Sequence, residues 1–318
     1  MEEKEDSVHF LADETITIYR SPKGLRVFPY TPGICVLPSG RYVFTNDVGG
    51  PDVLRLPGYD ALPENPHNCL DNIFSAERKR FGQIFTSDDK GLTWQRRAVR
   101  SFCHARPFFA GNAVYVLGQV GDLVIYRSTD GGDTWDDGHF LTEYETWHQS
   151  ACNVWIENDT VTLVMDRRYR KAGEEQTAWS VSHIAPVVLR DNVRDDLTKR
   201  ESWTFSDSVR FKDLIDENEL EYFGIPFLLT HNSAAKDPGA TNPPTDNLGW
   251  LEGNIVRFLD PDHIWYNPAG RTFHIFMRAH TAGTGYCAMM KATVSRENGK
   301  ETVIVQPETA PSGRTESS

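Results

Sequence analysis

Hydrophobic positions along this chain fall into short runs that alternate with polar residues, and turn-forming residues separate the runs. β-Branched and aromatic residues dominate the runs, and Gly, Asp, Asn or Pro bounds them, which is typical of strands joined by tight turns. Clear examples are residues 42–45, 113–117, 122–126, 160–165 and 272–277. The pattern predicts an all-β fold made of many short strands.

Two segments add to this picture. Between Ser208 and Tyr222, apolar residues recur at a spacing that would place them on one face of a helix, so we expect a helix there. Residues Thr15 to Tyr19 alternate as a strand and predict an additional β-strand near the N-terminus. No other stretch of the chain shows sustained helical periodicity.

Composition and charge exclude several classes of protein. The chain has 318 residues, of which 39% are hydrophobic and 25% charged, which excludes a disordered polypeptide. No apolar run reaches the roughly 18 residues of a membrane-spanning helix, so no membrane span is expected. Asp and Glu total 45 against 33 Lys and Arg, a formal charge of -12, and without a basic tract nucleic acid is not an expected partner.

The N-terminus and the cysteines narrow the expectations further. Met1 to Ser7 is charged and has no apolar region, so the chain as given carries no signal peptide, and a cytoplasmic location is the default expectation. The five cysteines are scattered and form no C-x-x-C pair. This spacing predicts neither a disulfide framework nor a zinc site, and no cofactor is expected.

An octapeptide pattern occurs twice, each time after a predicted strand. Ser87–Trp94 and Ser128–Trp135 both read S-x-D-x-G-x-T-W. The Asp and Ser side chains can accept hydrogen bonds from the backbone of a tight turn, Gly supplies a positive φ, and Trp supplies a large apolar plate. The chemistry is that of a folding motif on a hairpin rather than of a catalytic group.

The two octapeptides resemble the Asp boxes, or BNR repeats, of the sialidase-like β-propeller superfamily, where each box joins the third and fourth strands of a blade. The resemblance implies an all-β propeller, six-bladed in that family. Only about four blades can be placed on this sequence, so we expect an open arc of four. The expected organisation is an N-terminal tail over 1–12, a propeller domain over 13–305 and a flexible tail over 306–318.

The order of strands within a blade predicts which residues share a rim. The start of each first strand and the end of each second strand lie on one rim, opposite the octapeptides. The predicted pairs of first and second strands span 33–46, 106–119, 151–166 and 254–278. Long insertions over 47–79, 168–182 and 205–249 fall on the same rim, and their length is typical of binding loops.

Acidic, cationic and aromatic residues occupy these rim positions. They are Asp47, Arg106, His148, Arg167, Trp250, Glu252, Arg278 and His280. Arginine forks bind a carboxylate, and a pair of carboxyl groups can perform acid/base chemistry at an anomeric carbon. The rim is therefore a candidate site for an acidic carbohydrate. No metal is expected, because the histidines come from separate blades and lack the short spacing of a zinc site.

The resemblance assigns roles to some of these residues. The stretch that opens a strand with Glu252 and closes the next with Arg278 is similar to one in sialidases. There the Glu polarises a tyrosine nucleophile and the Arg grips the substrate carboxylate, which implies a catalytic Glu252 and a substrate-binding Arg278. Asp47 or Asp52 would match the acid/base aspartate. Rim position alone suggests that the others bind substrate; these are Arg106, His148, Arg167, Trp250 and His280.

Three functions fit this sequence. The acid-rich rim favours a sialidase-like exo-glycosidase that acts on an acidic sugar. The Arg-Ile-Pro motif of the family's first blade is absent, since Thr31-Pro32-Gly33-Ile34 stands there. That absence favours a non-catalytic carbohydrate-binding propeller or a lyase of uronic-acid polysaccharides, which would use His or Tyr as base and Arg to neutralise charge.

Overall fold

Strands dominate the computed structural model. It describes residues 14–58, 80–148, 152–169, 171, 183–214, 221–222, 225–226, 249–280, 287–298 and 300–307. Within these ranges, the helical elements are the short α1 (Phe211–Leu214) and the 3-10 turns η1 (Val53–Arg55) and η5 (Arg200–Ser202). No described helix has the length and apolar character needed to cross a membrane. The predicted all-β fold class is confirmed.

Four antiparallel sheets follow one another along the chain, and each forms one blade. Blade one contains β1 (Phe28–Val36), β2 (Tyr42–Gly49), β3 (Arg80–Ser87) and β4 (Gln95–Arg100). Blade two contains β5 (Cys103–Ala110), β6 (Ala113–Val120), β7 (Asp122–Ser128) and β8 (His139–Phe140).

The other two blades follow the same order of strands. Blade three contains β9 (Thr146–His148), β10 (Val154–Glu157), β11 (Thr160–Arg168), β12 (Ile184–Asn192) and β13 (Thr204–Phe205), with β9 and β10 both paired to β11. Blade four contains β16 (Gly249–Val256), β17 (Thr272–His280), β18 (Cys287–Glu297) and β19 (Lys300–Pro307). A separate small pair is formed by β14 (Glu221–Tyr222) and β15 (Ile225–Pro226).

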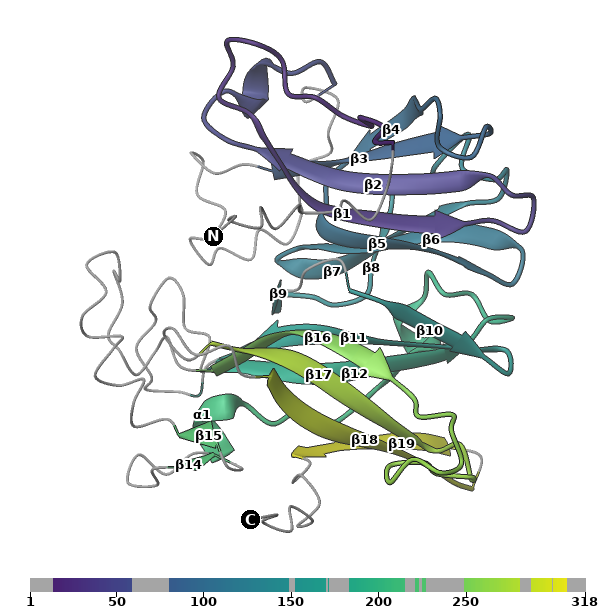
Figure 1. The fold of residues 1–318 in the computed structure, drawn as a ribbon, viewed down its shortest axis with the longest axis vertical. Helices are drawn as coiled ribbons and strands as arrows, with labels where there is room; N and C mark the ends of the chain where they lie inside the picture. Colours follow the sequence, from purple (N-terminus) through teal and green to yellow (C-terminus); the bar gives the residue numbers. More distant parts are fainter. Residues whose placement is uncertain are drawn as a thin grey trace, which may run out of the picture.

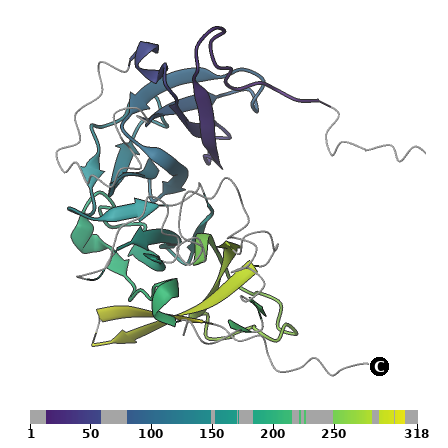
Figure 2. The ribbon, with the colours of Figure 1, turned by 90° about the vertical axis from the view of Figure 1, so that its left-hand side faces the viewer.

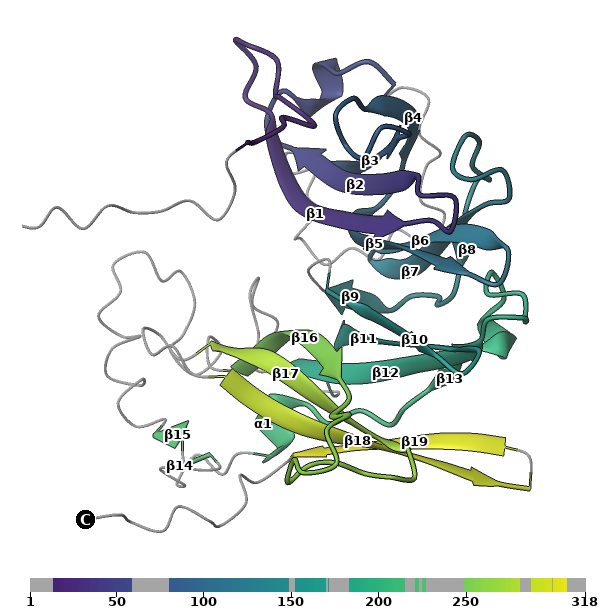
Figure 3. The same cartoon turned by 45° about the vertical axis from the view of Figure 1, so that its right-hand side comes forward.

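The blades are arranged as an arc. Blade one lies at the top of Figure 1 and blade four at the bottom, and the side view in Figure 2 shows the curvature between them. First strands of successive blades are neighbours, with β1 beside β5, β5 beside β10 and β10 beside β16. This is the inner position of strands in a β-propeller. Blades one and four stand at opposite ends of the arc (Figure 3), as the four-blade prediction expected.

The hydrophobic core lies between the blades rather than within any one of them. Val43 of blade one packs in one cluster with Val116 of blade two, and Trp147 of blade three joins blade two in a second cluster. Val164 of blade three packs with Ile255 of blade four in a third. Alternating residues of a strand point to opposite faces of its sheet, so each inner blade can present apolar side chains to both neighbours.

The two octapeptides form the same turn. In the first, Asp89 accepts hydrogen bonds from the Thr93 N–H at 2.9 Å and the Thr93 hydroxyl at 2.6 Å. The Gly91 N–H donates to Ser87 Oγ, and Trp94 Nε1 donates back to the Gly91 carbonyl, each at 2.8 Å. Every one of these bonds recurs in the second copy, between Asp130 and Thr134, Gly132 and Ser128, and Trp135 and Gly132.

Both octapeptide turns lie on one rim, and a single arginine links them. Arg41, in the turn between β1 and β2, donates to Asp88 of the first octapeptide at 2.6 Å. The same side chain donates to Asp133 of the second at 2.8 Å and to the Gly131 carbonyl at 3.2 Å. Each turn connects the third and fourth strands of its blade, as the sequence predicted.

Two predictions of local structure are wrong. Of the helix expected over 208–222, residues 215–220 lie outside the described residues; Phe211–Leu214 forms α1, residues 208–210 are not helical, and Glu221–Tyr222 is a strand. Phe211 packs edge-on against Trp250 with 5.3 Å between the rings, and a short helix forms only where such tertiary packing supports it. Residues 15–19 form no strand; Tyr19 packs against the Phe85 ring instead of pairing with a sheet.

The boundaries of the predicted tails also need adjustment. β19 continues to Pro307, so the last strand includes the first two residues of the expected tail over 306–318. Residues 1–13 and 308–318 lie outside the described residues. Most of the three long insertions on the predicted site rim lies outside them as well.

Candidate functional site

The first strands are all interrupted at one level, on the rim opposite the octapeptide turns. Register shifts mark β-bulges between Tyr30 and Gly33, between Cys103 and Arg106, and between Leu251 and Asn254. In blade three, the first strand is divided at the same level into β9 and β10. Bulges occur next to active sites, where they redirect a side chain out of the sheet.

The bulges hold non-glycine residues in the left-handed conformation. Thr31, His104 and Glu252 have φ values of 41°, 53° and 63°. Such backbone is costly for residues with a Cβ and persists only where surrounding contacts hold it. For His104 and Glu252 the contacts come from the neighbouring blade, and for Thr31 from Asp47 of its own blade.

The same bond joins two pairs of blades. Asp47, near the end of β2, accepts a hydrogen bond at 3.1 Å from the backbone N–H of His104 in the next blade. Asp166, near the end of β11, accepts one at 2.6 Å from the backbone N–H of Glu252 in the next blade. In blade two, Gln119 occupies the position near the end of the second strand that corresponds to Asp47 and Asp166. It would face residues 149–151, which lie outside the described residues. These side chains position the bulges from which the rim is built.

Arg80 completes a cluster around Asp47. Its Nη1 lies 3.5 Å from Asp47 Oδ2 and 3.2 Å from His104 Nε2, and its guanidinium lies 3.9 Å from the centre of the Tyr30 ring. Because arginine can only donate, His104 Nε2 accepts and the proton of the ring is on Nδ1. Gln119 Nε2 lies 3.2 Å from Nδ1, and the buried Gln119 Oε1 has no hydrogen-bond partner. Exchanging the nitrogen and oxygen of this amide would place an acceptor opposite the Nδ1 proton.

His148 connects this cluster to blades three and four. Its ring meets the His104 ring edge-on, with 5.3 Å between centroids. Burial, together with the positive charges of Arg168, Arg80 and Arg278, lowers the pKa of His148 to about 4. The imidazole is therefore neutral near pH 7.

Glu252 and Arg278 form the solvent-facing part of the cluster. Arg278 Nη1 lies 3.2 Å from Glu252 Oε2, and the two side chains are 55% and 27% exposed. The bulge in β16 places Glu252 at the rim, and Arg278 pairs with Leu251 from the end of β17. An ion pair this exposed is worth little in stability and can open to a ligand at small cost.

Two buried carboxyl groups have raised pKa values. Burial raises the pKa of Asp47 to about 6, against the opposing effects of the His104 N–H and Arg80. Burial raises the pKa of Asp166 to about 7, against the Glu252 N–H and Arg106. Carboxyl groups that hold a proton near neutral pH are candidates for acid/base chemistry. Asp52 differs, because hydrogen bonds from Arg26 lower its pKa and keep it ionised.

The structure thus brings together four of the predicted site residues on one rim. They are Asp47, His148, Glu252 and Arg278. The backbone of His280 pairs with Gly249 at the same rim, and its side chain lies outside what the structure describes.

Three of the predicted residues do not join the rim cluster. Arg106 is 2% exposed and donates to the carbonyls of Val164 and Asn153, so it holds blade three rather than a ligand. Trp250 is fully buried and donates to the Ile184 carbonyl in the core. Arg167 lies on the face of β11 opposite Asp166 and pairs with Glu145 at 2.7 Å. The alternation of side chains along β11 brings Arg168 to the cluster in its place.

Arg80 and Arg168 were not predicted. Arg80 starts the third strand of blade one and follows the insertion over 47–79. A third strand starts on the rim where the second strand ends, because Arg80 pairs with Gly49. The strand order alone predicts that the third strand begins on this rim. It does not predict which residue begins β3, because that depends on the pairing of β3 with β2.

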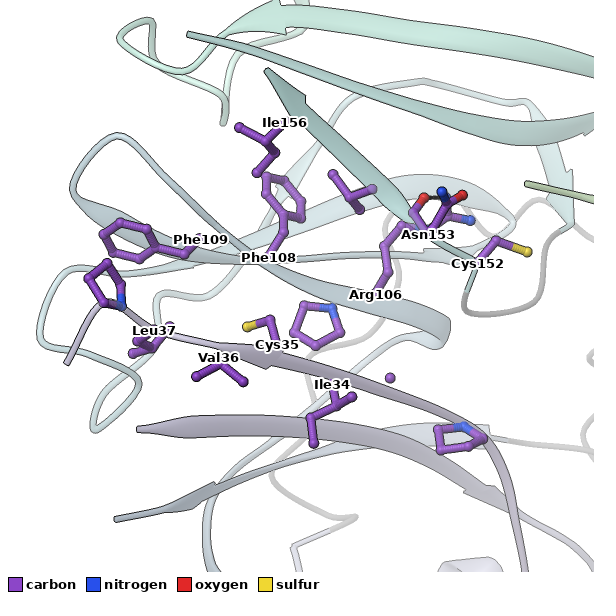
Figure 4. A pocket seen from close by; sticks show the side chains of 15 residues that line it. Ile34, Cys35, Val36, Leu37, Arg106, Phe108, Phe109, Cys152, Asn153 and Ile156 are labelled. Atoms are coloured by element: carbon purple, nitrogen blue, oxygen red, sulfur yellow. Dashed lines mark hydrogen bonds between the residues drawn. The ribbon is translucent and has the colours of Figure 1, made fainter. Parts of the chain in front are cut away.

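A groove runs along the inner strands, and no residue of the rim cluster is among those that line it. It has a volume of about 820 Å³, and β1, β5 and β10 line it. Figure 4 shows Arg106, Asn153 and Cys152 at one end and Leu37 and Phe109 at the other. Its walls are largely apolar. Among the described residues, no three His, Cys, Asp or Glu side chains converge as they would around a metal ion.

No family model and no curated protein matches this sequence. Among solved structures, the chain is similar to a Dyadobacter fermentans protein of unknown function, with a TM-score of 0.46 and 13% identity over 92% of this chain and 71% of that one. It is also similar to an α-L-arabinofuranosidase from Lactobacillus brevis, with a TM-score of 0.44 and 12% identity over 91% and 75%.

A third similar structure is the NanB sialidase of Streptococcus pneumoniae, with a TM-score of 0.42 and 8% identity over 86% of this chain. The chain spans 48% of the length of that sialidase. At such low TM-scores the similarities carry no argument about activity, which has to come from the side chains.

Proposed function

We propose that the rim cluster is the active site of a sialidase-like glycoside hydrolase that acts on an acidic sugar. One observation carries the proposal: Arg80 and Arg278 lie in a cluster that also holds the solvent-facing Glu252 and the buried Asp47. Cations that can hold a carboxylate are thereby combined with carboxyl groups that can move a proton.

The guanidinium groups would bind the carboxylate of the sugar. Arg278 and Arg80 are both partly exposed, and each can donate charge-assisted hydrogen bonds. Arg168 adds positive charge close to His148. This local charge works against a molecule with a formal charge of -12, so binding depends on direct contact rather than on long-range attraction.

Glu252 and Asp47 would perform the proton transfers. Glu252 faces solvent and would accept a proton from an attacking hydroxyl or water. Asp47 is fully buried beside Arg80, so it reaches the leaving oxygen only when Arg80 turns towards the bound carboxylate. With a pKa of about 6, Asp47 holds a proton in part of the molecules near neutral pH.

A non-catalytic carbohydrate-binding propeller is the second candidate. It is favoured by the equivalence of Asp47 and Asp166, since both are buried and both hold the backbone of the next blade. In such a protein the carboxyl groups of Asp47 and Asp166 would be structural. Arg278 and Glu252 would bind a ligand without catalysing a reaction.

The test is a panel of aryl sialosides, aryl uronides and neutral aryl glycosides, with variants at the rim. We expect turnover of an acidic glycoside. Glu252→Gln should lower kcat about 100-fold or more, and Arg278→Ala should mainly raise KM, by about 10-fold. Asp47→Asn should lower kcat by at least about 100-fold if Asp47 donates a proton. An asparagine oxygen can still accept the His104 N–H, so unchanged turnover in this variant would make Asp47 structural.

A matched ion pair on the other rim provides the controls. Glu157 and Arg257 pair where β10 and β16 end, with side-chain exposures of 32% and 14%. Glu157→Gln and Arg257→Ala should leave kcat and KM unchanged. If no glycoside is cleaved but acidic sugars bind and Arg278→Ala weakens that binding, the binding propeller is the correct function. If Glu252→Gln leaves turnover unchanged in an active protein, the proposed role of Glu252 is wrong.

A further inference from the structure

Arg167, which lies away from the rim cluster, lines a second hollow. The hollow has a volume of about 360 Å³ and lies where blade two meets blade three. Glu145, Trp147, Arg200 and Phe205 also line it. Arg167 and Arg168 are consecutive on β11 and point to opposite faces, so only the width of this strand separates the hollow from the rim cluster.

Glu145 is the only carboxylate among the described lining residues that contacts Arg167 or Arg200, and its oxygens are already bound within the protein. Glu145 Oε1 pairs with Arg167 Nη2 at 2.7 Å, and Oε2 accepts from Trp147 Nε1 at 3.0 Å. Both oxygens of Glu145 therefore have partners within the protein. Glu143, the other acid of the lining, is exposed, and solvent screens its charge.

Arg200 is held in place without a carboxylate partner. Its guanidinium lies 3.7 Å from the centre of the Phe205 ring, and Nη1 donates to the Trp203 carbonyl at 3.0 Å. Within the part of the chain that the structure describes, no carboxylate lies within ion-pair distance of Arg200. Burial lowers the pKa of this guanidinium, and Glu145 offsets only part of that effect. Its remaining N–H groups are the unused donors of the hollow.

We propose that this hollow is a second anion subsite, in which Arg200 and Arg167 bind the carboxylate of another unit of an acidic oligosaccharide. The inference rests on the proposed function, because the first acidic unit would lie in the rim cluster. The ligand class is then an oligomer of acidic sugars rather than a single terminal sugar. Phe205 fixes the Arg200 guanidinium before the ligand arrives, which reduces the entropy lost on binding.

The test compares monomers and trimers by isothermal titration calorimetry. The probes are sialic acid and its linear trimer, and galacturonic acid and its linear trimer. In at least one series, we expect the native chain to bind the trimer about 10-fold more tightly than the monomer, or better. Arg200→Gln should remove most of that advantage and leave the affinity for the monomer unchanged. Arg167→Gln should act in the same direction, and Arg200→Lys should restore part of the loss.

Arg194→Gln is the matched control. Arg194 is exposed like Arg200 and pairs with a carboxylate, Asp159, as Arg167 does with Glu145, but it lies near the turn between β10 and β11 on the opposite rim. This variant should bind both probes like the native chain. Circular dichroism melting would show whether each variant folds, and Arg200 is exposed enough that its substitution should leave the fold intact.

Two outcomes would overturn the proposal and are distinguishable. If the native chain binds the monomer but the trimer binds no more tightly, or if Arg200→Gln and Arg167→Gln keep the full advantage of the trimer, the subsite is wrong and the proposed function stands. If the native chain binds neither monomer nor trimer, the subsite fails together with the acidic-sugar site.

Discussion

The two rims of the propeller use the same residue, aspartate, with pKa values shifted in opposite directions. On the octapeptide rim, the Thr134 hydroxyl and N–H lower the pKa of Asp130 to about 2, and Thr93 does the same for Asp89. On the site rim, burial raises the pKa of Asp47 to about 6 and that of Asp166 to about 7. Asp130 is exposed and Asp89 is partly exposed, whereas the site aspartates are fully buried.

The difference shows what separates a structural aspartate from one that can hold a proton. Each octapeptide carboxylate accepts several hydrogen bonds from its own turn while water still solvates it, so the ionised form is favoured. Asp166 has lost its hydration, and the Glu252 N–H and Arg106 do not compensate for that loss. The octapeptide aspartates therefore stabilise their turns as ionised carboxylates. The site aspartates can carry a proton near neutral pH, close to the candidate active site.

The largest expected effect concerns the site rim. The folded pKa of Asp166 is about 7, above its ordinary value of 3.8, so its contribution to stability is complete below about pH 4. It is lost as pH rises through 7, at a cost of roughly 2 to 4 kcal/mol. Asp166→Asn carries no charge and can still accept the Glu252 N–H. We expect this variant to be more stable than the native chain at pH 8 and nearly equal at pH 4.

Urea unfolding at pH 4 and pH 8 measures this difference. Asp47 would contribute a smaller change of the same sign, over a window that ends near pH 6. An Asp166→Asn variant no more stable than the native chain at pH 8 would remove the distinction between the two rims.

A smaller effect is expected on the octapeptide rim. Asp130→Ala removes the acceptor of the Thr134 hydroxyl and N–H and should destabilise the chain by about 1 kcal/mol. Asp89→Ala should change stability in the same direction, because its turn has the same bonds. The control is Asp137→Ala, an exposed acid in the same loop, which should be nearly neutral. A neutral Asp130→Ala would contradict the structural role of the turn.

The smallest effect is the acid dependence of these turns. The folded pKa values of Asp89 and Asp130 lie below 3.8, so their contribution to stability is complete above that value and lost as pH falls towards 2. Solvent screening of exposed carboxylates keeps the loss small. The melting temperature of the native chain should therefore fall between pH 4 and pH 2 by more than that of an Asp89→Asn, Asp130→Asn double variant. Equal falls would show that other carboxylates dominate acid unfolding.

The two octapeptides show which structural features local sequence determines and which it does not. Their internal hydrogen bonds are the same, yet Trp135 is 8% exposed and Trp94 remains partly exposed. The large apolar ring of each octapeptide favours burial, and only Trp135 is buried. Trp135 packs in the cluster between blades one and two, whereas Trp94 packs against Tyr42 and Phe44 of its own blade. Burial is decided by the neighbouring blade, which the octapeptide does not encode.

The amino-acid sequence by itself determined the strands, the octapeptide turns and the rim where the candidate residues gather. These follow from local chemistry: alternation of apolar residues, turn-forming side chains, and the order of strands in a blade. Asp47, His148, Glu252 and Arg278 could be placed on that rim for this reason.

Only the tertiary structure decided which of the rim side chains can meet a ligand. A shift of one residue along β11 exchanges Arg167 for Arg168, because successive side chains point to opposite faces. Arg106 and Trp250 are enclosed by the neighbouring blade, and Arg80 joins the cluster through its pairing with β2. Register and blade packing depend on contacts between residues far apart in the chain. The spacing of residues along one strand cannot specify these contacts.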